Sequence, residues 1–298
     1  MRKFLGKDFI CDVAEELSVL ELPVCGPIAA GYPAEAYNYR EDPIDMNQYI
    51  LGLKESDKKL DSNGKVVYMN RKKEHIKCVW ATNKNMTGEG IDYTDLIVYD
   101  ETRTPTKDSV LLFWLDDEFA LKRCNRKKDC LELISLRDDI PAIEYTGESL
   151  QRLGVVTHVI KKYSAYNNQI AGYPADAHRY IAEGMDFNEY VIGDNYWETI
   201  FYLWAGGDSM AGDNIFKRDL LVVDKLRDHF EDSILAFHIN QEFTLKRIKY
   251  YDDHNELVSS NPDIKPIPIR KGDELSRWGV LVNVVKKFVR DKTDVCPL

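Results

Sequence analysis

The feature that most constrains this fold is an internal repeat. Ala-Gly-Tyr-Pro-Ala occupies residues 30–34 and returns at residues 171–175, a displacement of 141 (171−30). At the same displacement, residues 44–50 match residues 185–191. Similarity at one fixed displacement is the signature of a duplicated unit. The sequence therefore predicts two related domains in tandem.

The displacement shortens farther along the chain, to 124 (219−95) and finally to 125 (279−154). The first copy therefore carries 17 extra residues (141−124). They fall in the polar stretch 55–71, where Asp-Ser-Asn-Gly at 61–64 is typical of a hairpin tip. The later matches pair residues 95–100 with 219–224, 118–123 with 242–247, and 154–159 with 279–284.

Both copies are predicted to be mainly β. Short runs rich in Val, Ile, Phe and Tyr are separated by Gly, Asp and Asn. Helical periodicity is limited to possible turns near residues 47–51 and 188–192. The fold class is therefore mainly β, in two tandem domains. The predicted segments are an N-terminal arm (1–24, with one helical turn at 13–17), a first domain (25–163) and a second domain (164–298).

Composition excludes several classes of function. With 44% hydrophobic and 30% charged residues, the chain can form real cores. A formal net charge of −10 argues against direct, sequence-independent DNA binding, which requires basic residues to neutralise phosphates. No apolar run is long enough for a membrane helix. The six cysteines form no Cys-x-x-Cys pair and the six histidines are scattered. We therefore expect reduced thiols, no metal, no cofactor and a cytoplasmic location.

One glycine-rich turn holds a candidate nucleophile. Ser209 follows the apolar run 200–204 in the turn Gly-Gly-Asp-Ser-Met, and Lys246 lies 37 residues downstream (246−209) in a strand-like run. A lysine acts as a base only when burial lowers its pKa, and an apolar strand face supplies that burial. The pattern alone is weak, because a serine in a Gly-Asp turn more often bonds its own backbone.

The repeat supplies an internal comparison for this pair. At a displacement of 124, Ser209 falls on Asn85 and Lys246 falls on Lys122. Asparagine has no hydroxyl with which to form an acyl intermediate. The first copy is therefore predicted to be catalytically inactive, although it keeps the lysine and its own Ala-Gly phrase.

These motifs, in this order and spacing, give the second copy a specific likeness. It resembles the peptidase domain of the LexA/UmuD family, the self-cleaving serine peptidases of the bacterial SOS response to DNA damage, and UmuD more closely than LexA. Arg218, and Thr94 in the first copy, depart from the glycine usual in the family. The matching features are Ala171-Gly172, Gly207-Asp208-Ser209-Met210, Asp219-Leu220-Leu221, Phe243-Thr244-Leu245-Lys246-Arg247 and Gly279-Val280-Leu281-Val282.

The resemblance implies an autocatalytic Ser-Lys mechanism. Ser209 would be the nucleophile, neutral Lys246 its general base, and the backbone N–H groups of Asp208 and Ser209 the oxyanion donors. The scissile bond would be Ala171-Gly172. The matching Ala30-Gly31 bond is either a relic or a second bond that Ser209 reaches across from the other copy.

The resemblance also implies partners and an alternative function. Processed members of the family bind the RecA filament and a translesion DNA polymerase, so the chain could be chiefly a non-catalytic interaction module. Family members form dimers. The two copies would therefore form an intramolecular pseudo-dimer, or the chain would form a homodimer. The alternative is that the two copies are independent domains. A signal peptidase shares the Ser-Lys chemistry but requires a membrane anchor that this sequence lacks.

Overall fold

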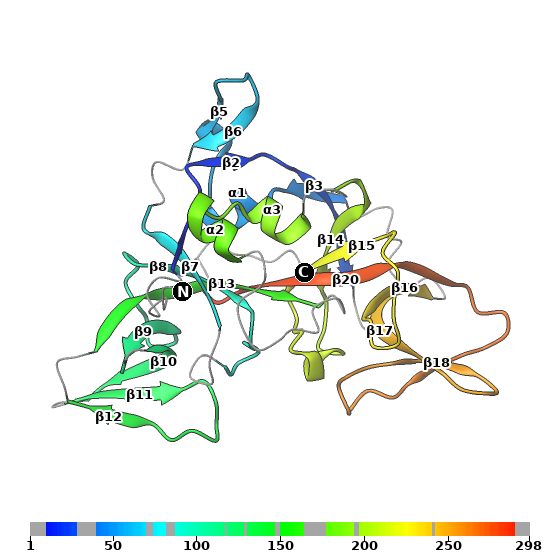
Figure 1. Cartoon of the computed structure of the whole chain (residues 1–298). Helices are drawn as coiled ribbons and strands as arrows, with labels where there is room; N and C mark the ends of the chain where they lie inside the picture. Colours follow the sequence, from blue (N-terminus) through cyan, green and yellow to red (C-terminus); the bar gives the residue numbers. More distant parts are fainter. Residues whose placement is uncertain are drawn as a thin grey trace.

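The chain folds into two similar, strand-rich lobes that lie side by side (Figure 1). The mainly β prediction is confirmed. Helical turns occur where they were expected, as α1 (Met46–Leu51) and α3 (Phe187–Ile192). The computed structural model describes residues 10–28, 40–69, 74–81, 87–116, 118–127, 130–146, 150–163, 177–193, 197–239 and 242–289.

Seven strands of the first copy recur in the second, and each begins 124 residues later (for example 200−76). The first set is β7 (Ile76–Trp80), β8 (Leu96–Asp100), β9 (Leu111–Leu115), β10 (Glu118–Arg126), β11 (Leu131–Ser135), β12 (Ile143–Tyr145) and β13 (Gln151–Lys162). The second set is β14 (Ile200–Ala205), β15 (Leu220–Asp224), β16 (Leu235–Ile239), β17 (Glu242–Tyr250), β18 (Asn255–Val258), β19 (Ile267–Ile269) and β20 (Leu275–Lys287).

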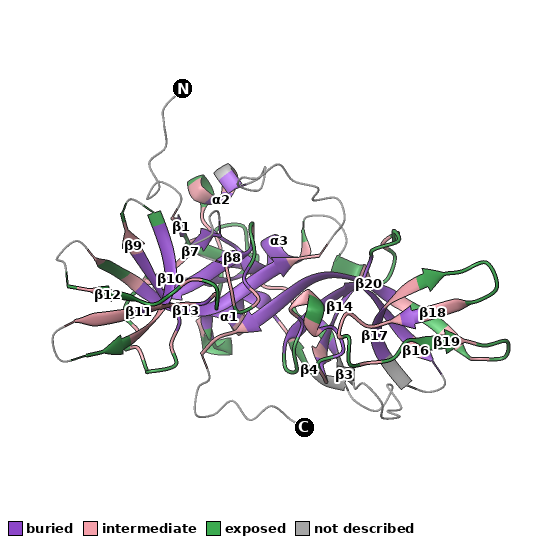
Figure 2. Ribbon diagram, turned by 90° about the horizontal axis from the view of Figure 1, so that it is seen from below, coloured by how far each residue is buried: buried purple, intermediate pink, exposed green. Residues whose placement is uncertain are grey.

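The two lobes share one continuous sheet. Hydrogen-bonded neighbours follow the order β7-β8-β13-β9-β10-β11-β12 in the first copy and β14-β15-β20-β16-β17-β18-β19 in the second. The long strands β13 and β20 then pair antiparallel with each other, from His158 opposite Lys287 to Lys162 opposite Asn283. Both strands are buried along most of their length, and they join the lobes through the centre of the molecule (Figure 2).

The same glycine position shapes both long strands. A Cβ atom at Gly154 would lie 2.6 Å from the carbonyl oxygen of Asp100, and one at Gly279 would lie 2.6 Å from that of Asp224. Contacts that short exclude any side chain. The glycine that opens the last repeated motif is therefore needed so that β13 and β20 can approach their neighbours closely.

A buried polar junction joins α1 to α3. Asn47 Oδ1 accepts from the N–H of Phe187, and Asn188 Oδ1 accepts from the N–H of Met46, both at 2.8 Å. The two asparagines occupy the same position of the repeat (188−47 = 141). Each satisfies an N-terminal amide of the other copy's helix, which would otherwise lack a partner. Both side-chain amides also donate to the carbonyl oxygen of Ser18, at 3.0 Å.

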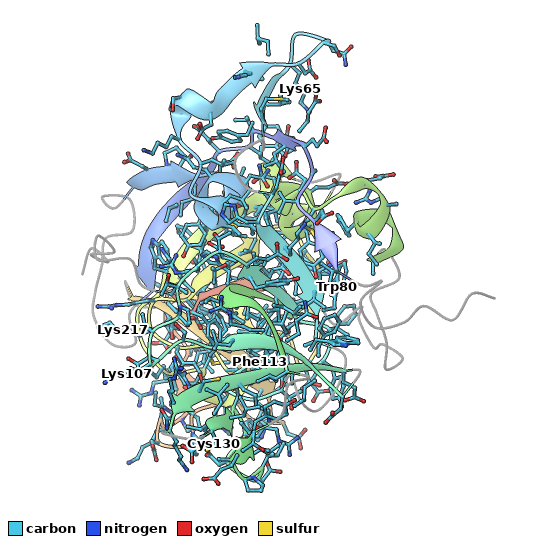
Figure 3. All side chains as sticks on the ribbon, turned by 90° about the vertical axis from the view of Figure 1, so that its left-hand side faces the viewer. Lys65, Trp80, Lys107, Phe113, Cys130 and Lys217 are labelled. Atoms are coloured by element: carbon cyan, nitrogen blue, oxygen red, sulfur yellow. The ribbon has the colours of Figure 1, made fainter. Side chains whose placement is uncertain are left out.

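The insertion in the first copy is the expected hairpin. After the 3-10 turn η3 (Glu55–Asp57), β5 (Lys58–Leu60) pairs antiparallel with β6 (Val66–Met69), and β6 pairs in turn with β2 (Glu16–Ser18). Lys65, at the turn between β5 and β6, projects from the end of the molecule opposite Cys130 (Figure 3).

The N-terminal segment is woven through both copies. β1 (Cys11–Asp12) pairs with β7 of the first copy, whereas β3 (Leu22–Ile28) pairs with β4 (Arg40–Ile44) and, in parallel, with β14 of the second copy. The helical turn predicted at 13–17 is wrong. Val13 instead bridges to Met185 and Leu17 lies in β2, so both apolar side chains are buried by extended backbone.

The helix α2 (Ala177–Glu183) packs beside β1, where its Tyr180 carbonyl oxygen accepts a hydrogen bond from the Cys11 thiol at 2.8 Å. Among the described residues, no helix is long and apolar enough to cross a membrane.

Candidate active site

Ser209 lies in a tight turn at the end of a buried strand. β14 buries four consecutive residues (200–203) and ends at the buried Ala205, and the 3-10 turn η6 (Ala211–Asp213) follows the serine. The Asp208 carboxylate accepts from the N–H of Lys217 at 2.9 Å and thereby folds the loop back on itself. Ser209 is 8% exposed. The predicted nucleophile is thus held in a nearly dry position.

Lys246 lies in the interior of β17, opposite Leu235 of β16. Its side chain is 2% exposed, and Nζ donates to the carbonyl oxygen of Leu245 at 3.0 Å. Among the described residues no carboxylate pairs with it. Burial therefore lowers the pKa of Lys246 to about 8. Desolvation penalises the ammonium form, and no charged group among the described residues compensates for it.

Ser209 and the lysine strand meet at one small recess. Thr244 and Leu245, the two residues before Lys246, contribute to its wall together with the serine turn. The recess is lined by Ala205, Gly206, Gly207, Ser209, Met210, Ile215, Leu221, Thr244 and Leu245. The nucleophile and the strand of its expected base are therefore brought together, although no Ser209–Lys246 hydrogen bond occurs between these two described residues.

The backbone of the serine turn is fixed from outside. Asn261 donates from its N–H to the carbonyl oxygen of Ser209 and from Nδ2 to that of Asp208, both at 3.1 Å. Neither the Asp208 nor the Ser209 N–H donates to another described residue. The two amides expected to bind an oxyanion are thus left without a described acceptor, while the carbonyl groups of both residues are held.

Four buried lysines fall into two kinds. Lys161 and Lys286 occupy one position of the repeat and pair with Asp95 and Asp219. Lys122 and Lys246 occupy another, and neither has an ion pair within the described ranges. Burial lowers the pKa of Lys122 as well. An unpaired buried lysine is costly to keep, so the second position differs from an ordinary structural ion pair.

The inactive centre predicted in the first copy is only partly visible. Lys122 is 2% exposed in β10 and lies opposite Leu111, the counterpart of Leu235. Asn85, the counterpart of Ser209, lies outside the described residues. So do both predicted cleavage points, Ala30-Gly31 and Ala171-Gly172.

The two departures from the family's glycine fall at a strained turn. Thr94 has φ +71° and Arg218 has φ +79°, a backbone conformation that L residues rarely adopt. Their N–H groups donate to the carbonyl oxygens of Ala81 and Ala205, both at 2.7 Å. The turn forms in both copies without glycine, at a cost in backbone strain.

An ion pair beside the serine turn was not predicted from the sequence. The Arg247 guanidinium binds the Asp213 carboxylate, with Nη2 at 2.7 Å from Oδ1, and so joins the turn to β17. In the first copy, Arg123 binds Glu89 at the same repeat positions (247−123 and 213−89). That repetition was the available sequence signal.

The matches to a known protein family correspond to the two copies of the repeat. The Peptidase S24-like family model matches twice, over residues 23–157 and over residues 165–282. The chain therefore belongs to the Peptidase S24-like family, and the resemblance inferred from its motifs is confirmed.

Similar proteins are LexA repressors. That of Anaeromyxobacter dehalogenans (strain 2CP-1 / ATCC BAA-258) is 31% identical over 120 residues, which cover 40% of this chain and 52% of the relative. That of Oleidesulfovibrio alaskensis is 33% identical over 112 residues, 38% of this chain and 53% of the relative. The chain thus spans about half the length of these curated relatives.

Over the ranges that the structure describes, no cluster of three His, Cys, Asp or Glu side chains is arranged to hold a metal ion.

Proposed function

We propose that this chain is a self-cleaving serine peptidase with one active centre, formed by Ser209 and Lys246. The observation that carries the proposal is the shared recess. A nearly buried serine lies beside a strand whose lysine is buried, has no counterion among the described residues and has a pKa of about 8. Such a lysine is neutral often enough at mildly alkaline pH to act as a base.

The proposed chemistry uses Lys246, the Ser209 hydroxyl and the backbone of the serine turn. Neutral Lys246 Nζ takes the proton of Ser209 Oγ as the oxygen attacks the substrate carbonyl carbon. The N–H groups of Asp208 and Ser209 stabilise the oxyanion. The lysine then gives its proton to the leaving amide nitrogen, the C–N bond breaks, and water hydrolyses the ester left on Ser209.

The path of β3 supports Ala30-Gly31 as the preferred bond. β3 runs parallel to β14, with Ile28 paired to Ala205, and it also lies close to β17. The C-terminal ends of β3 and β14 therefore lie on the same side, where Ala205 lines the recess. Ala30 follows Ile28 by two residues in the sequence (30−28).

The likeness to LexA repressors supports a role in the SOS response. In this proposal the cut is a switch that a RecA filament triggers, and a translesion DNA polymerase is a candidate partner of the products. The alternative is a non-catalytic interaction module for the same partners. It is favoured by one observation, that Lys246 Nζ donates to the Leu245 carbonyl oxygen.

The deciding experiment follows the intact mass of the purified chain at pH 7–10, with and without an activated RecA filament. We expect fragments 1–30 and 31–298 from the natural chain and none from Ser209→Ala. Ala30→Asp is expected to block the cut, whereas the matched Ala171→Asp leaves it unchanged.

Fragments ending at Ala171 would instead assign the other bond. Equal cleavage of the Ser209→Ala variant would refute the dyad and indicate a contaminating protease. Absence of any cut with the filament present would favour the interaction module.

A further inference from the structure

We propose that Tyr163 of the first copy is a positioning residue for the Ser209 centre of the second copy. This inference rests on the proposed function, and it gives the inactive copy a part in catalysis besides supplying a substrate bond.

Tyr163 reaches the second copy directly after β13. Its N–H donates to the carbonyl oxygen of Val282 in β20 at 2.8 Å, which extends the pairing of the two long strands. Its ring packs against the second-copy core, which contains Met210, Ile215 and Leu245 from the wall of the recess. The aromatic ring thus supports the side of the site that faces the protein interior.

The hydroxyl of Tyr163 holds the serine turn itself. It donates to the carbonyl oxygen of Asp213 at 2.5 Å, four residues after Ser209 (213−209). Burial raises the pKa of the phenol, so the hydroxyl keeps its proton throughout the pH range in which Lys246 titrates.

Asp213 links that contact to the lysine strand. Its carboxylate binds the guanidinium of Arg247, which is the neighbour of Lys246 in β17 and also donates from Nε to the carbonyl oxygen of Asp232 at 3.0 Å. Tyr163, Asp213 and Arg247 therefore form one connection that sets the serine turn relative to β17. Loss of the Tyr163 hydroxyl should therefore loosen both the serine turn and β17, which form the two sides of the recess.

A second contact from the first copy reaches the same turn. Asn214 donates from Nδ2 to Asp92 at 3.2 Å, and its carbonyl oxygen accepts from Lys286 Nζ at 2.7 Å. The end of η6 is thus held from the first copy at two adjacent residues.

The repeat provides a natural control for the hydroxyl. Phe288 is the counterpart of Tyr163 (288−163 = 125), its N–H donates to the Thr157 carbonyl oxygen at 2.8 Å, and it packs against the first-copy core. Each copy therefore packs an aromatic ring against the core of the other copy. Only the ring that packs against the copy with Ser209 carries a hydroxyl. Because phenylalanine fills the equivalent place, the hydroxyl is not required for the fold.

The test uses the full chain and compares Tyr163→Phe with Phe288→Tyr. First-order self-cleavage rates are measured from pH 6 to 10, together with Tm. For Tyr163→Phe we expect the rate to fall about tenfold, the loss that a small misplacement of reacting groups causes. The midpoint of the pH profile should rise, because a loosened turn admits water to Lys246. Phe288→Tyr should leave both unchanged.

Unchanged rate and midpoint in Tyr163→Phe would overturn the positioning role and leave the proposed function intact. A fall in rate explained by a lower Tm, with the same midpoint, would also overturn it, since that is a structural effect only. If the natural chain shows no Ser209-dependent cleavage, the proposed function fails and this inference fails with it.

Discussion

Ile160 and Val285 lie directly opposite each other in the pairing of β13 with β20, and they occupy the same position of the repeat (285−160 = 125). The pairs on either side are related in the same way, since His158 faces Lys287 and Lys162 faces Asn283. An approximate two-fold axis therefore passes through the Ile160–Val285 pair. This is the isologous contact of a symmetric dimer, made within one chain.

That symmetry is broken where function is expected. β1 lies antiparallel against β7, so the N-terminal arm occupies this edge of the first copy. The equivalent edge of β14 is taken by β3, which runs in parallel toward the serine turn. The N-terminal segment thus pairs with β7 of the first copy through β1 and with β14 of the second copy through β3. The two copies therefore have different roles in the proposed cleavage.

The rate of self-cleavage should follow the neutral fraction of Lys246. With its pKa at about 8, about one tenth of the lysine is neutral at pH 7, so the rate should rise about tenfold between pH 7 and a plateau above the pKa. Lys246→Arg should abolish cleavage because a guanidinium stays charged. Lys122→Met should leave the profile unchanged. A rate that is flat from pH 7 to 9 in the natural chain would exclude Lys246 as the base.

Removing the same lysine should stabilise the fold. Its pKa is lower in the folded chain than the ordinary 10.5, so between about pH 8 and 10.5 the unfolded chain holds more protons and the free energy of unfolding rises with pH. At pH 7 the full cost is present, about 3 kcal/mol at 1.4 kcal/mol per pKa unit.

We therefore expect Lys246→Met, in a Ser209→Ala background that prevents cutting, to raise the urea midpoint at pH 7 and to lose that advantage near pH 10. The exposed Lys249→Met in the same strand should change little. Equal stability of Lys246→Met and its parent at both pH values would show that burial of this lysine carries no cost.

The turn at Thr94 and Arg218 offers a matched pair of stabilising changes. Both residues have a positive φ, which costs an L residue about 1–2 kcal/mol. Thr94→Gly and Arg218→Gly should each raise the free energy of unfolding by about 1 kcal/mol or less, since glycine also loses more chain entropy. The gain should be larger for the β-branched threonine. Lys217→Gly, beside Arg218, should destabilise, and a destabilising Arg218→Gly would contradict the strain argument.

Most of the fold could be predicted from the repeat, because matched strands must recur at matched displacements. The change in displacement predicted the length of the insertion, and the polar stretch with its Asp-Ser-Asn-Gly turn placed it at residues 55–71. The arm could not be predicted in the same way. Val13 and Leu17 have helical spacing, but their burial depends on Met185 and on β6, which are distant in sequence. Long-range pairing overrides a five-residue pattern, and no local signal reveals it.

The site was predictable in part for the same physical reason. Ser209 and Lys246 carry a motif, and the second copy differs from the first at the serine. Tyr163 carries none, because its role depends on the crossing of β13 and β20. The sequence shows that Tyr163 corresponds to Phe288. The significance of that difference is clear only once the structure shows that the residue after each long strand packs against the other copy.

Cutting at Ala30-Gly31 should leave residues 1–30 bound to the rest of the chain. The segment is anchored by four strand pairings. The Ser18 hydroxyl also donates to Asp186 at 3.0 Å, and the Ser18 carbonyl oxygen accepts from both junction asparagines. The two products should therefore elute together in native size-exclusion chromatography and separate only under denaturing conditions.

The thiol of Cys78 gives an independent reading of the same prediction. It lies opposite Cys11 in the β1–β7 pair, and burial raises its pKa well above the ordinary value, so it should resist iodoacetamide at pH 8 while β1 stays in place. The uncut Ser209→Ala chain sets the protected rate and the urea-unfolded chain sets the free rate. If the cut protein reacts at the free rate, the arm has left, and cleavage releases residues 1–30 instead of loosening them in place.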